Sequence, residues 1–201
     1  NRALLAELAV RADRINRHMG GAQAAPISTG GSLGGVYPKA IVQLPTAMQT
    51  EPVLSAREVL VGGETPHGHV FAIVKFSLVE DDEDRGAVEF AFHAMARAAG
   101  LHVPPACLLD DGAGGRHFAV ERFDRVERDD GTSKRLHVQS LSALIHRNAV
   151  GAIRYEDFVT VASLLDGPEA AAEAFRRVVF NLLATNRDDH GRNHAFLYDP
   201  E

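Results

Sequence analysis

The sequence is poor in the residues that hold secreted or zinc-stabilised small domains together. Its 201 residues include one cysteine, Cys107, which cannot form a disulfide within the chain. No set of cysteines and histidines has the spacing of a zinc finger. These absences exclude an internal disulfide framework and favour a cytoplasmic protein.

Long apolar runs and an excess of basic residues are also missing. No uninterrupted apolar run approaches the roughly 20 residues that span a bilayer, and the N-terminus lacks the order of a signal peptide. Lysine and arginine number 21 against 27 acidic residues, which gives a net charge of −6, and the basic residues are scattered. We therefore expect no membrane partner and no direct contact with nucleic acid.

The remaining composition is that of a folded chain, with 45% hydrophobic and 24% charged residues. Such a chain can bury a sizeable core, either as one large domain or as two small lobes around a cleft. It starts at Asn1 without a methionine and stops inside a predicted strand and turn. We therefore expect a fragment, and we expect the natural protein to continue past Glu201.

Hydrophobic periodicity predicts a sheet-rich first part and a mostly helical second part. The first part has expected helices at 2–18 and 87–99 and expected strands at 40–42, 69–78, 103–109 and 117–123. The second part has expected helices at 138–146 and 155–165, one opened by Pro168, and a strand at 195–198. A stripe along the last helix is expected to be buried: Phe175, Val178, Val179, Leu182 and Leu183.

The most informative segment is the polar loop 186–193, which reads Asn-Arg-Asp-Asp-His-Gly-Arg-Asn. An ordinary surface loop could have this composition. However, an Arg-Asp pair followed by asparagine five positions after the aspartate resembles the protein-kinase catalytic loop, with Asn186 in place of its histidine. In that chemistry, Asp188 orients the attacking hydroxyl and accepts its proton, and Asn193 is a neutral oxygen ligand for Mg²⁺.

A metal-hydrolase cluster is the second interpretation of the same loop. Its members would be Asp189, His190 and His194. No further carboxylate or histidine group lies elsewhere at recognisable ligand spacing, so the kinase-like interpretation is preferred.

Lys75 is a single full charge inside the apolar strand predicted at 69–78. A lysine there is costly unless its ammonium group reaches an anion, although a lysine on an edge strand can also reach solvent. The segment 72–75, Ala-Ile-Val-Lys, resembles the kinase strand whose lysine binds the α- and β-phosphates. Glu89 on the next helix could pair with Lys75, or it could be a solvated carboxylate in the first helical turn.

A glycine-rich stretch precedes that strand. Gly34 and Gly35 could bring bare backbone amides close to phosphate oxygens, and Lys39 would add charge. Alone, such a stretch is weak support, because most glycine- and serine-rich stretches are flexible. The order of glycine-rich loop, strand lysine, helix glutamate and Asp-x4-Asn loop is the kinase order.

Six segments carry a more specific resemblance: 32–39, 73–75, 88–90, 99–104, 119–125 and 188–193. The two most distinctive are V-E-R-F-D-R at 120–125 and D-x-H-x-[KR]-N at 188–193. In this order the chain resembles the HipA family of type II toxin–antitoxin serine/threonine kinases over nearly its whole length.

The resemblance implies an α+β, bilobal, protein-kinase-like fold. Residues 1–123 would form a β-rich N-lobe with the glycine-rich loop and the phosphate-binding lysine, and residues 124–201 the start of a helical C-lobe with the catalytic loop. The family has a further Mg²⁺-binding aspartate. It is not assigned to Asp199, which follows Asn193 too closely and lies in an apparent hairpin turn. We expect this stretch alone to be a poor or inactive kinase.

The resemblance also implies roles for individual residues. Asp188 would be the catalytic base and Asn193 the Mg²⁺ ligand, while Glu89 would pair with Lys75. Ser32 would be autophosphorylated, ejecting its loop and disabling ATP binding, although it could also be an ordinary turn serine. Adenine would bind backbone groups of Glu121 and Phe123. The full set implied to bind ATP is Gly34, Gly35, Lys39, Lys75, Glu121, Arg122, Phe123, His190, Arg192 and Asn193.

The implied reaction is Mg²⁺-dependent transfer of the ATP γ-phosphoryl group to a protein serine or threonine hydroxyl. In the family's toxins the substrate is an aminoacyl-tRNA synthetase. The resemblance further implies a HipB-like helix-turn-helix antitoxin that holds the kinase inactive and binds operator DNA, so DNA would be contacted only indirectly. Two alternatives stay open: a small-molecule kinase on the same fold, and a non-catalytic partner in a toxin–antitoxin repressor complex.

Overall fold

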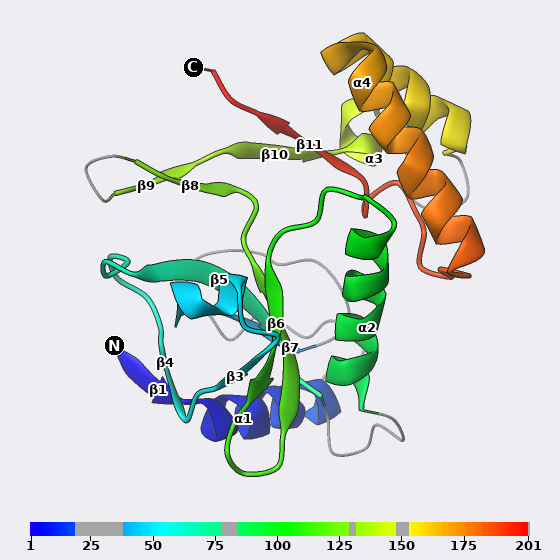
Figure 1. The fold of residues 1–201 in the computed structure, drawn as a ribbon. Coiled ribbons are helices and arrows are strands. Elements are labelled where there is room, and N and C mark those ends of the chain that lie inside the picture. Colours follow the sequence, from blue (N-terminus) through cyan, green and yellow to red (C-terminus); the bar gives the residue numbers. More distant parts are fainter. Residues whose placement is uncertain (19–37, 78–83, 129–131, 148–152, 201) are drawn as a thin grey trace. The chain divides into compact units, whose positions relative to one another are not determined.

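The computed structural model describes residues 1–18, 38–77, 84–128, 132–147 and 153–200, with the elements labelled in Figure 1. The chain forms two compact units. The first consists of Asn1–Ala94 and Val103–Lys134, and the second of Met95–His102 and Arg135–Glu201. The boundary expected between residues 123 and 124 stays a prediction. Within the described residues, no helix is both long enough and apolar enough to cross a membrane.

A seven-stranded sheet forms the centre of the first unit, in the order β1-β4-β2-β5-β7-β6-β3. Its pairs are antiparallel except for β3 and β6, which run parallel. The strands are β1 (Arg2–Leu4), β2 (Lys39–Pro45), β3 (Val53–Ser55), β4 (Glu58–Leu60), β5 (His69–Lys75), β6 (Ala106–Asp110) and β7 (Arg116–Glu121). The short strands β8 (Arg125–Glu127) and β9 (Ser133–Arg135) pair as a separate ribbon.

The helix α1 (Leu5–His18) covers one face of this sheet. Its buried Leu5, Leu8 and Ala12 lie in one core cluster with alternate residues of the central strands, such as Val42 and Val74. The helix begins later than the predicted residue 2, because residues 2–4 pair with β4 as β1. Since side chains alternate along a strand, the residues between the buried positions face away from α1.

The helix α2 (Arg85–Ala98) begins in close contact with β7. A Cβ atom at Gly86 would overlap the carbonyl oxygen of Arg116, so only glycine allows this approach. The Gly86 N–H donates to Ser77 Oγ over 3.0 Å, and Ala87 N–H donates to Asp84 Oδ1 over 3.1 Å. These contacts fix the first turn of α2 on the strands and thereby place Glu89, one turn further along.

The second unit combines a two-stranded antiparallel sheet with two helices. Its elements are β10 (His137–Ser140), α3 (Leu141–Leu144), α4 (Tyr155–Leu183) and β11 (Ala195–Tyr198). The helix expected at 138–146 is wrong in its first part, because residues 137–140 pair with β11 instead. The backbone of α4 is non-helical at Asp166 and Gly167, where φ is +77° at Gly167, and its second half opens at Pro168 as expected.

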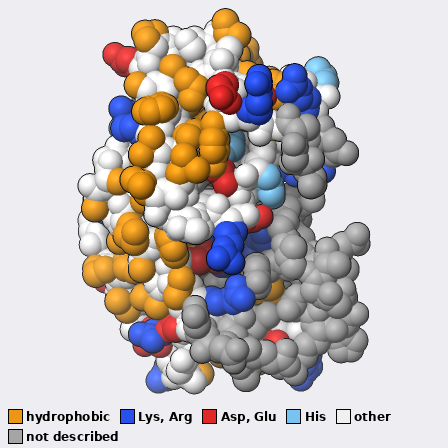
Figure 2. All heavy atoms as spheres, turned by 90° about the vertical axis from the view of Figure 1, so that its right-hand side faces the viewer, with side chains coloured by type: hydrophobic (Ala, Val, Ile, Leu, Met, Phe, Trp, Pro, Cys, Tyr) orange, Lys and Arg blue, Asp and Glu red, His pale blue; other side chains and the backbone are white. Residues whose placement is uncertain are grey.

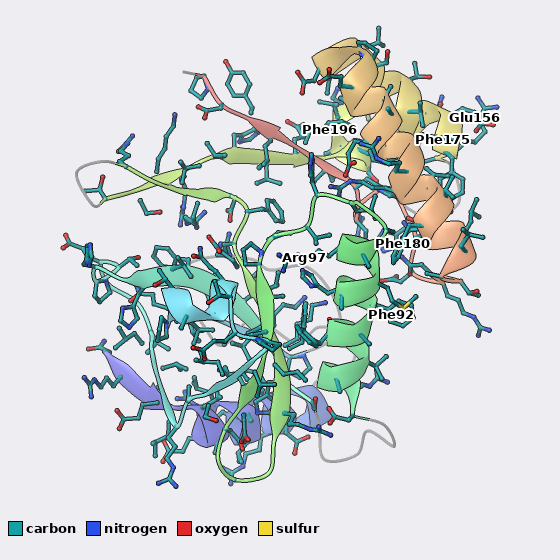
Figure 3. All side chains as sticks on the ribbon, viewed as in Figure 1. Phe92, Arg97, Glu156, Phe175, Phe180 and Phe196 are labelled. Carbon is teal, nitrogen blue, oxygen red and sulfur yellow. The ribbon has the colours of Figure 1, made fainter. Side chains whose placement is uncertain are left out.

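The second half of α4 exposes most of the stripe that was expected to be buried. Val178 is buried, but Phe175 and Leu182 are exposed and Leu183 is 82% exposed. Figure 2 shows hydrophobic side chains exposed on one face of the molecule, and Figure 3 labels Phe175 and Phe180 on α4. Periodicity identifies the helix correctly, but it cannot identify which neighbour covers each apolar side chain.

Replacing Gly86 by alanine is expected to destabilise the protein. Glycine-to-alanine changes inside helices normally stabilise by about 0.5–1 kcal/mol, whereas here the new methyl group meets backbone and should cost about 1–3 kcal/mol. Urea unfolding of the wild type and Gly86→Ala measures the difference. Ala87→Gly in the same turn is the control for helix propensity. A Gly86→Ala protein more stable than the wild type would contradict the close approach.

Candidate functional site

Two lysines lie opposite each other on the sheet of the first unit. Lys39 of β2 and Lys75 of β5 are registered partners, on the face away from α1. Like charges directly opposite destabilise a sheet unless another charge compensates them. Glu89 of α2 supplies one negative charge, with its Oε2 2.5 Å from Lys75 Nζ. The structure thus brings Lys39, Lys75 and Glu89 together as a group with net positive charge.

The surroundings of Lys39 and Lys75 favour an anionic ligand. Burial lowers the pKa of Lys39, the charge of Lys75 lowers it further, and only Glu89 opposes both effects. Lys75 Nζ also lies 5.7 Å from the ring centroid of Phe118, its partner on β7. An anion bound between the lysines would favour the charged form of Lys39 and thus oppose the lowering of its pKa. Perturbed groups of this kind are concentrated at functional sites.

The V-E-R-F-D-R segment is a turn closed on Asp124. Arg122 Nε and Nη2 donate to the Asp124 carboxylate over 2.8 and 2.6 Å, and Arg125 Nη1 donates to it over 2.5 Å. The guanidinium of Arg122 is therefore used inside the segment. Asp124 was not among the predicted site residues, although an aspartate between two arginines in the motif was a signal for such a turn.

The backbone N–H groups of Glu121 and Phe123, just before Asp124, differ in their hydrogen bonding. The Glu121 N–H donates to Pro105 O over 2.8 Å, and the Glu121 side chain accepts from Gln49 Nε2 over 2.8 Å. Phe123 is 52% exposed, and within the described chain no group accepts its N–H. The segment therefore offers a backbone donor at Phe123, an exposed residue whose N–H has no acceptor among the described residues, and such a donor can bind a planar heterocycle.

The loop after α4 presents an exposed carboxylate beside an amide. The Asp188 side chain is 84% exposed. Asn193 Nδ2 donates to Asp188 O over 2.6 Å and lies 3.3 Å from Asp188 Oδ2, and Asn186 Oδ1 accepts from the Asp188 N–H over 3.1 Å. Because Nδ2 is turned to Asp188, the Asn193 Oδ1 is left as an oxygen ligand. A carboxylate and an amide oxygen suit proton transfer and a hard cation such as Mg²⁺.

The neighbouring carboxylate of Asp189 points inward, and its side chain is only 5% exposed. Its Oδ2 accepts from the Tyr155 hydroxyl and its Oδ1 is bonded to His194 Nε2, both over 2.7 Å. The hydrogen bond that Tyr155 donates to Asp189 raises the pKa of Tyr155, so the tyrosine stays protonated. Tyr155 was not among the predicted site residues, and nothing in its sequence context marked it.

The residues of the metal-hydrolase interpretation do not form one cluster. His190 Nε2 lies 3.4 Å from Asp188 Oδ1, whereas His194 is bonded to Asp189. Across the part of the chain that the structure describes, no group of three or more histidine, cysteine or acidic side chains could hold a metal ion.

The other predicted site residues divide into two groups. Ser32, Gly34 and Gly35 lie outside the described residues. Arg192 is exposed in the loop, where its N–H donates to His190 Nδ1 over 3.3 Å. Asp199, to which no metal-binding role was assigned, follows β11 directly, and β11 pairs with β10.

The sequence of the chain matches a family model and a curated protein. The family model described as HipA-like C-terminal domain matches residues 31–201. The Sinorhizobium fredii protein named "Putative kinase Y4mE" is 28% identical over 116 residues, which are 53% of this chain and 27% of that protein.

The fold is also similar to a solved structure. It resembles a chain in the complex of the Shewanella oneidensis MR-1 toxin–antitoxin system HipA, HipB and its operator DNA, with a TM-score of 0.61 and 20% identity. The match covers 94% of this chain and 46% of that chain. The mixed helix-and-sheet fold is therefore a known one, and the chain spans less than half the length of these relatives.

The Asp124 cluster is expected to make stability fall in acid. Burial would raise the pKa of Asp124, but Arg122 and Arg125 outweigh it and hold the pKa below its usual value. A lowered folded pKa stabilises above the unfolded pKa of about 3.9, and this contribution disappears as the pH falls through the folded pKa.

Asp124→Asn should therefore cost about 1–3 kcal/mol at pH 7 and flatten the loss of stability below about pH 4. Thermal unfolding from pH 7 to pH 2.5 measures both. Glu58→Gln, which removes an exposed pair with Arg2, is the control and should change little. Equal acid dependence in the wild type and Asp124→Asn would refute this role.

Proposed function

The chain belongs to the HipA-like C-terminal domain family, and from that premise we propose that it is a kinase that transfers the γ-phosphoryl group of ATP to a protein hydroxyl. The observation that carries the proposal is the loop in which Asn193 Nδ2 donates to the backbone carbonyl of Asp188, whose carboxylate is exposed. The cationic group of Lys39, Lys75 and Glu89 supports it, because kinases use a lysine–glutamate pair to hold phosphates.

The side chains suit both ATP and Mg²⁺. Lys39 and Lys75 would hold phosphate oxygens, and the backbone N–H of Phe123, an exposed residue, would donate to adenine. Asn193 would hold Mg²⁺ through Oδ1, the neutral oxygen of a type that this cation accepts. When bound, the cation neutralises charge on the phosphates.

Asp188 performs the proton transfer in this proposal. Its carboxylate orients the acceptor hydroxyl and takes its proton as the hydroxyl oxygen bonds to the γ-phosphorus. The bond from the γ-phosphorus to the bridging oxygen breaks, and ADP leaves with that oxygen. His190, 3.4 Å from Asp188, and Arg192 would lie on the phosphate side.

The finer parts of the proposal rest on the family resemblance. They are a bilobal kinase fold, serine/threonine specificity, autophosphorylation at Ser32 and an aminoacyl-tRNA synthetase as substrate. A HipB-like antitoxin is the proposed partner, and the solved complex of HipA, HipB and operator DNA supports it. DNA would then be reached through that antitoxin.

Loss of Asp188 is expected to abolish transfer. With γ-labelled ATP, Mg²⁺ and cell extract as acceptor, Asp188→Ala in the full-length gene product should lower labelling of protein by about 10²–10⁴-fold. Glu156→Gln, an exposed acidic residue on α4, is the matched control and should label normally. Label only on a metabolite would favour a small-molecule kinase. A folded wild type without ATP binding or transfer would refute the kinase and favour the repressor-complex partner.

Ser32 is expected to be the residue that carries phosphate on the protein itself. After incubation with ATP and Mg²⁺, mass spectrometry should find phosphate on Ser32 in the wild type and none in Asp188→Ala. A phosphate there would repel those of a second ATP, so the phosphorylated protein should bind ATP at least about tenfold more weakly. Phosphate at other residues in both Ser32→Ala and the wild type would contradict this site.

A further inference from the structure

Two neighbouring carboxylates in the loop have opposite environments. Asp188 is exposed, while Asp189 is buried and receives a hydrogen bond on each oxygen. We propose that Asp189, held by Tyr155 and His194, is a positioning residue that fixes the loop carrying Asp188 and Asn193. The catalytic part of this inference rests on the proposed function.

The bonds of Asp189 connect distant parts of the second unit. Tyr155 is the first residue of α4, 34 positions before Asp189, and His194 directly follows Asn193. The His194 ring packs on Phe158 of α4 with a centroid distance of 4.2 Å, and Phe158 in turn contacts Phe196 of β11, which Figure 3 labels. One carboxylate thus ties the loop, on both sides of Asn193, to the start of the helix.

The proton positions follow from the chemistry of the carboxylate. An ionised aspartate only accepts hydrogen bonds, so both Tyr155 Oη and His194 Nε2 must donate. An asparagine at position 189 would accept one bond and present its NH₂ group to the other donor. This change keeps the size of the side chain and removes its negative charge, and it breaks one of the two bonds unless the His194 proton moves from Nε2 to Nδ1.

Backbone hydrogen bonds also fix the loop at Gly191 and His194. The Ser142 N–H donates to Gly191 O over 3.0 Å, and the Leu141 N–H donates to His194 O over 2.8 Å. A Cβ atom at Gly191 would overlap Ile153 Cδ1, so the loop lies directly against its neighbours. Because Gly191 and His194 are held by these bonds, loss of the hydrogen bonds to Asp189 should displace the part of the loop that carries Asp188.

The first test separates catalysis from binding in the full-length protein. Asp189→Asn should lower kcat by about 10–100-fold, because small misplacements of reacting groups have effects of this size. The KM for ATP should change less than about twofold. Asp157→Asn is the matched control: Asp157 also accepts at the start of α4, from the Arg154 N–H over 3.0 Å, but does not touch the loop. It should lower stability and leave kcat unchanged.

The second test does not need kinase activity. The Asn193 N–H donates to His190 O over 2.8 Å inside the loop. Its hydrogen exchange, measured by NMR without ligands, should be at least about tenfold faster in Asp189→Asn than in the wild type or in Asp157→Asn. Tyr155→Phe removes one bond and keeps the carboxylate, so it should give a smaller increase and serves where Asp189→Asn does not fold.

The outcomes distinguish the two proposals. Unchanged exchange and unchanged kcat in Asp189→Asn or Tyr155→Phe would overturn the positioning role. Faster exchange in a protein that never transfers phosphate would support positioning and refute the kinase. In an active kinase, the double variant of Tyr155→Phe and Asp189→Asn should lose no more kcat than Asp189→Asn alone. An additive loss of kcat would overturn the inference that Tyr155 acts through Asp189.

Discussion

The ion pair between Lys75 and Glu89 is the contact on which the cationic site of the first unit depends. It joins the central strand β5 to α2, and α2 can reach that strand because Gly86 lets its first turn lie against β7. Without the glutamate, the two lysines that lie opposite each other on one face would lose the negative charge that it supplies. With it, the group keeps one excess positive charge, which suits an incoming anion.

The loop of the second unit shows how environment separates two identical residues. Asp188 and Asp189 differ in no covalent property, yet one faces solvent and the other receives hydrogen bonds from a tyrosine and a histidine. A buried carboxylate with both oxygens bonded makes a rigid support, and an exposed one can exchange a proton. The loop therefore holds the exposed Asp188 carboxylate next to a carboxylate that is fixed by two hydrogen bonds.

The sequence predicted the parts in which local pattern and tertiary contacts agree. The strands β5, β6 and β7, the helix α2 and the order of the candidate site residues follow from periodicity and motif spacing. Residues 2–4 and 137–140 have helical patterns but are strands, because each segment finds a distant partner, β4 or β11. Tyr155 could not be predicted, since its role depends on a contact 34 residues away.

The alternation of side chains along β2 also determines which face of the sheet Lys39 occupies. Ala40, Val42 and Leu44 are buried in the core cluster with α1, so Lys39 must face the other way, beside Lys75. A slip of one residue in this pairing would turn Lys39 into the core and an apolar residue outward, at a large cost in burial. The hydrophobic core therefore fixes the register, and the register fixes the charge of the site.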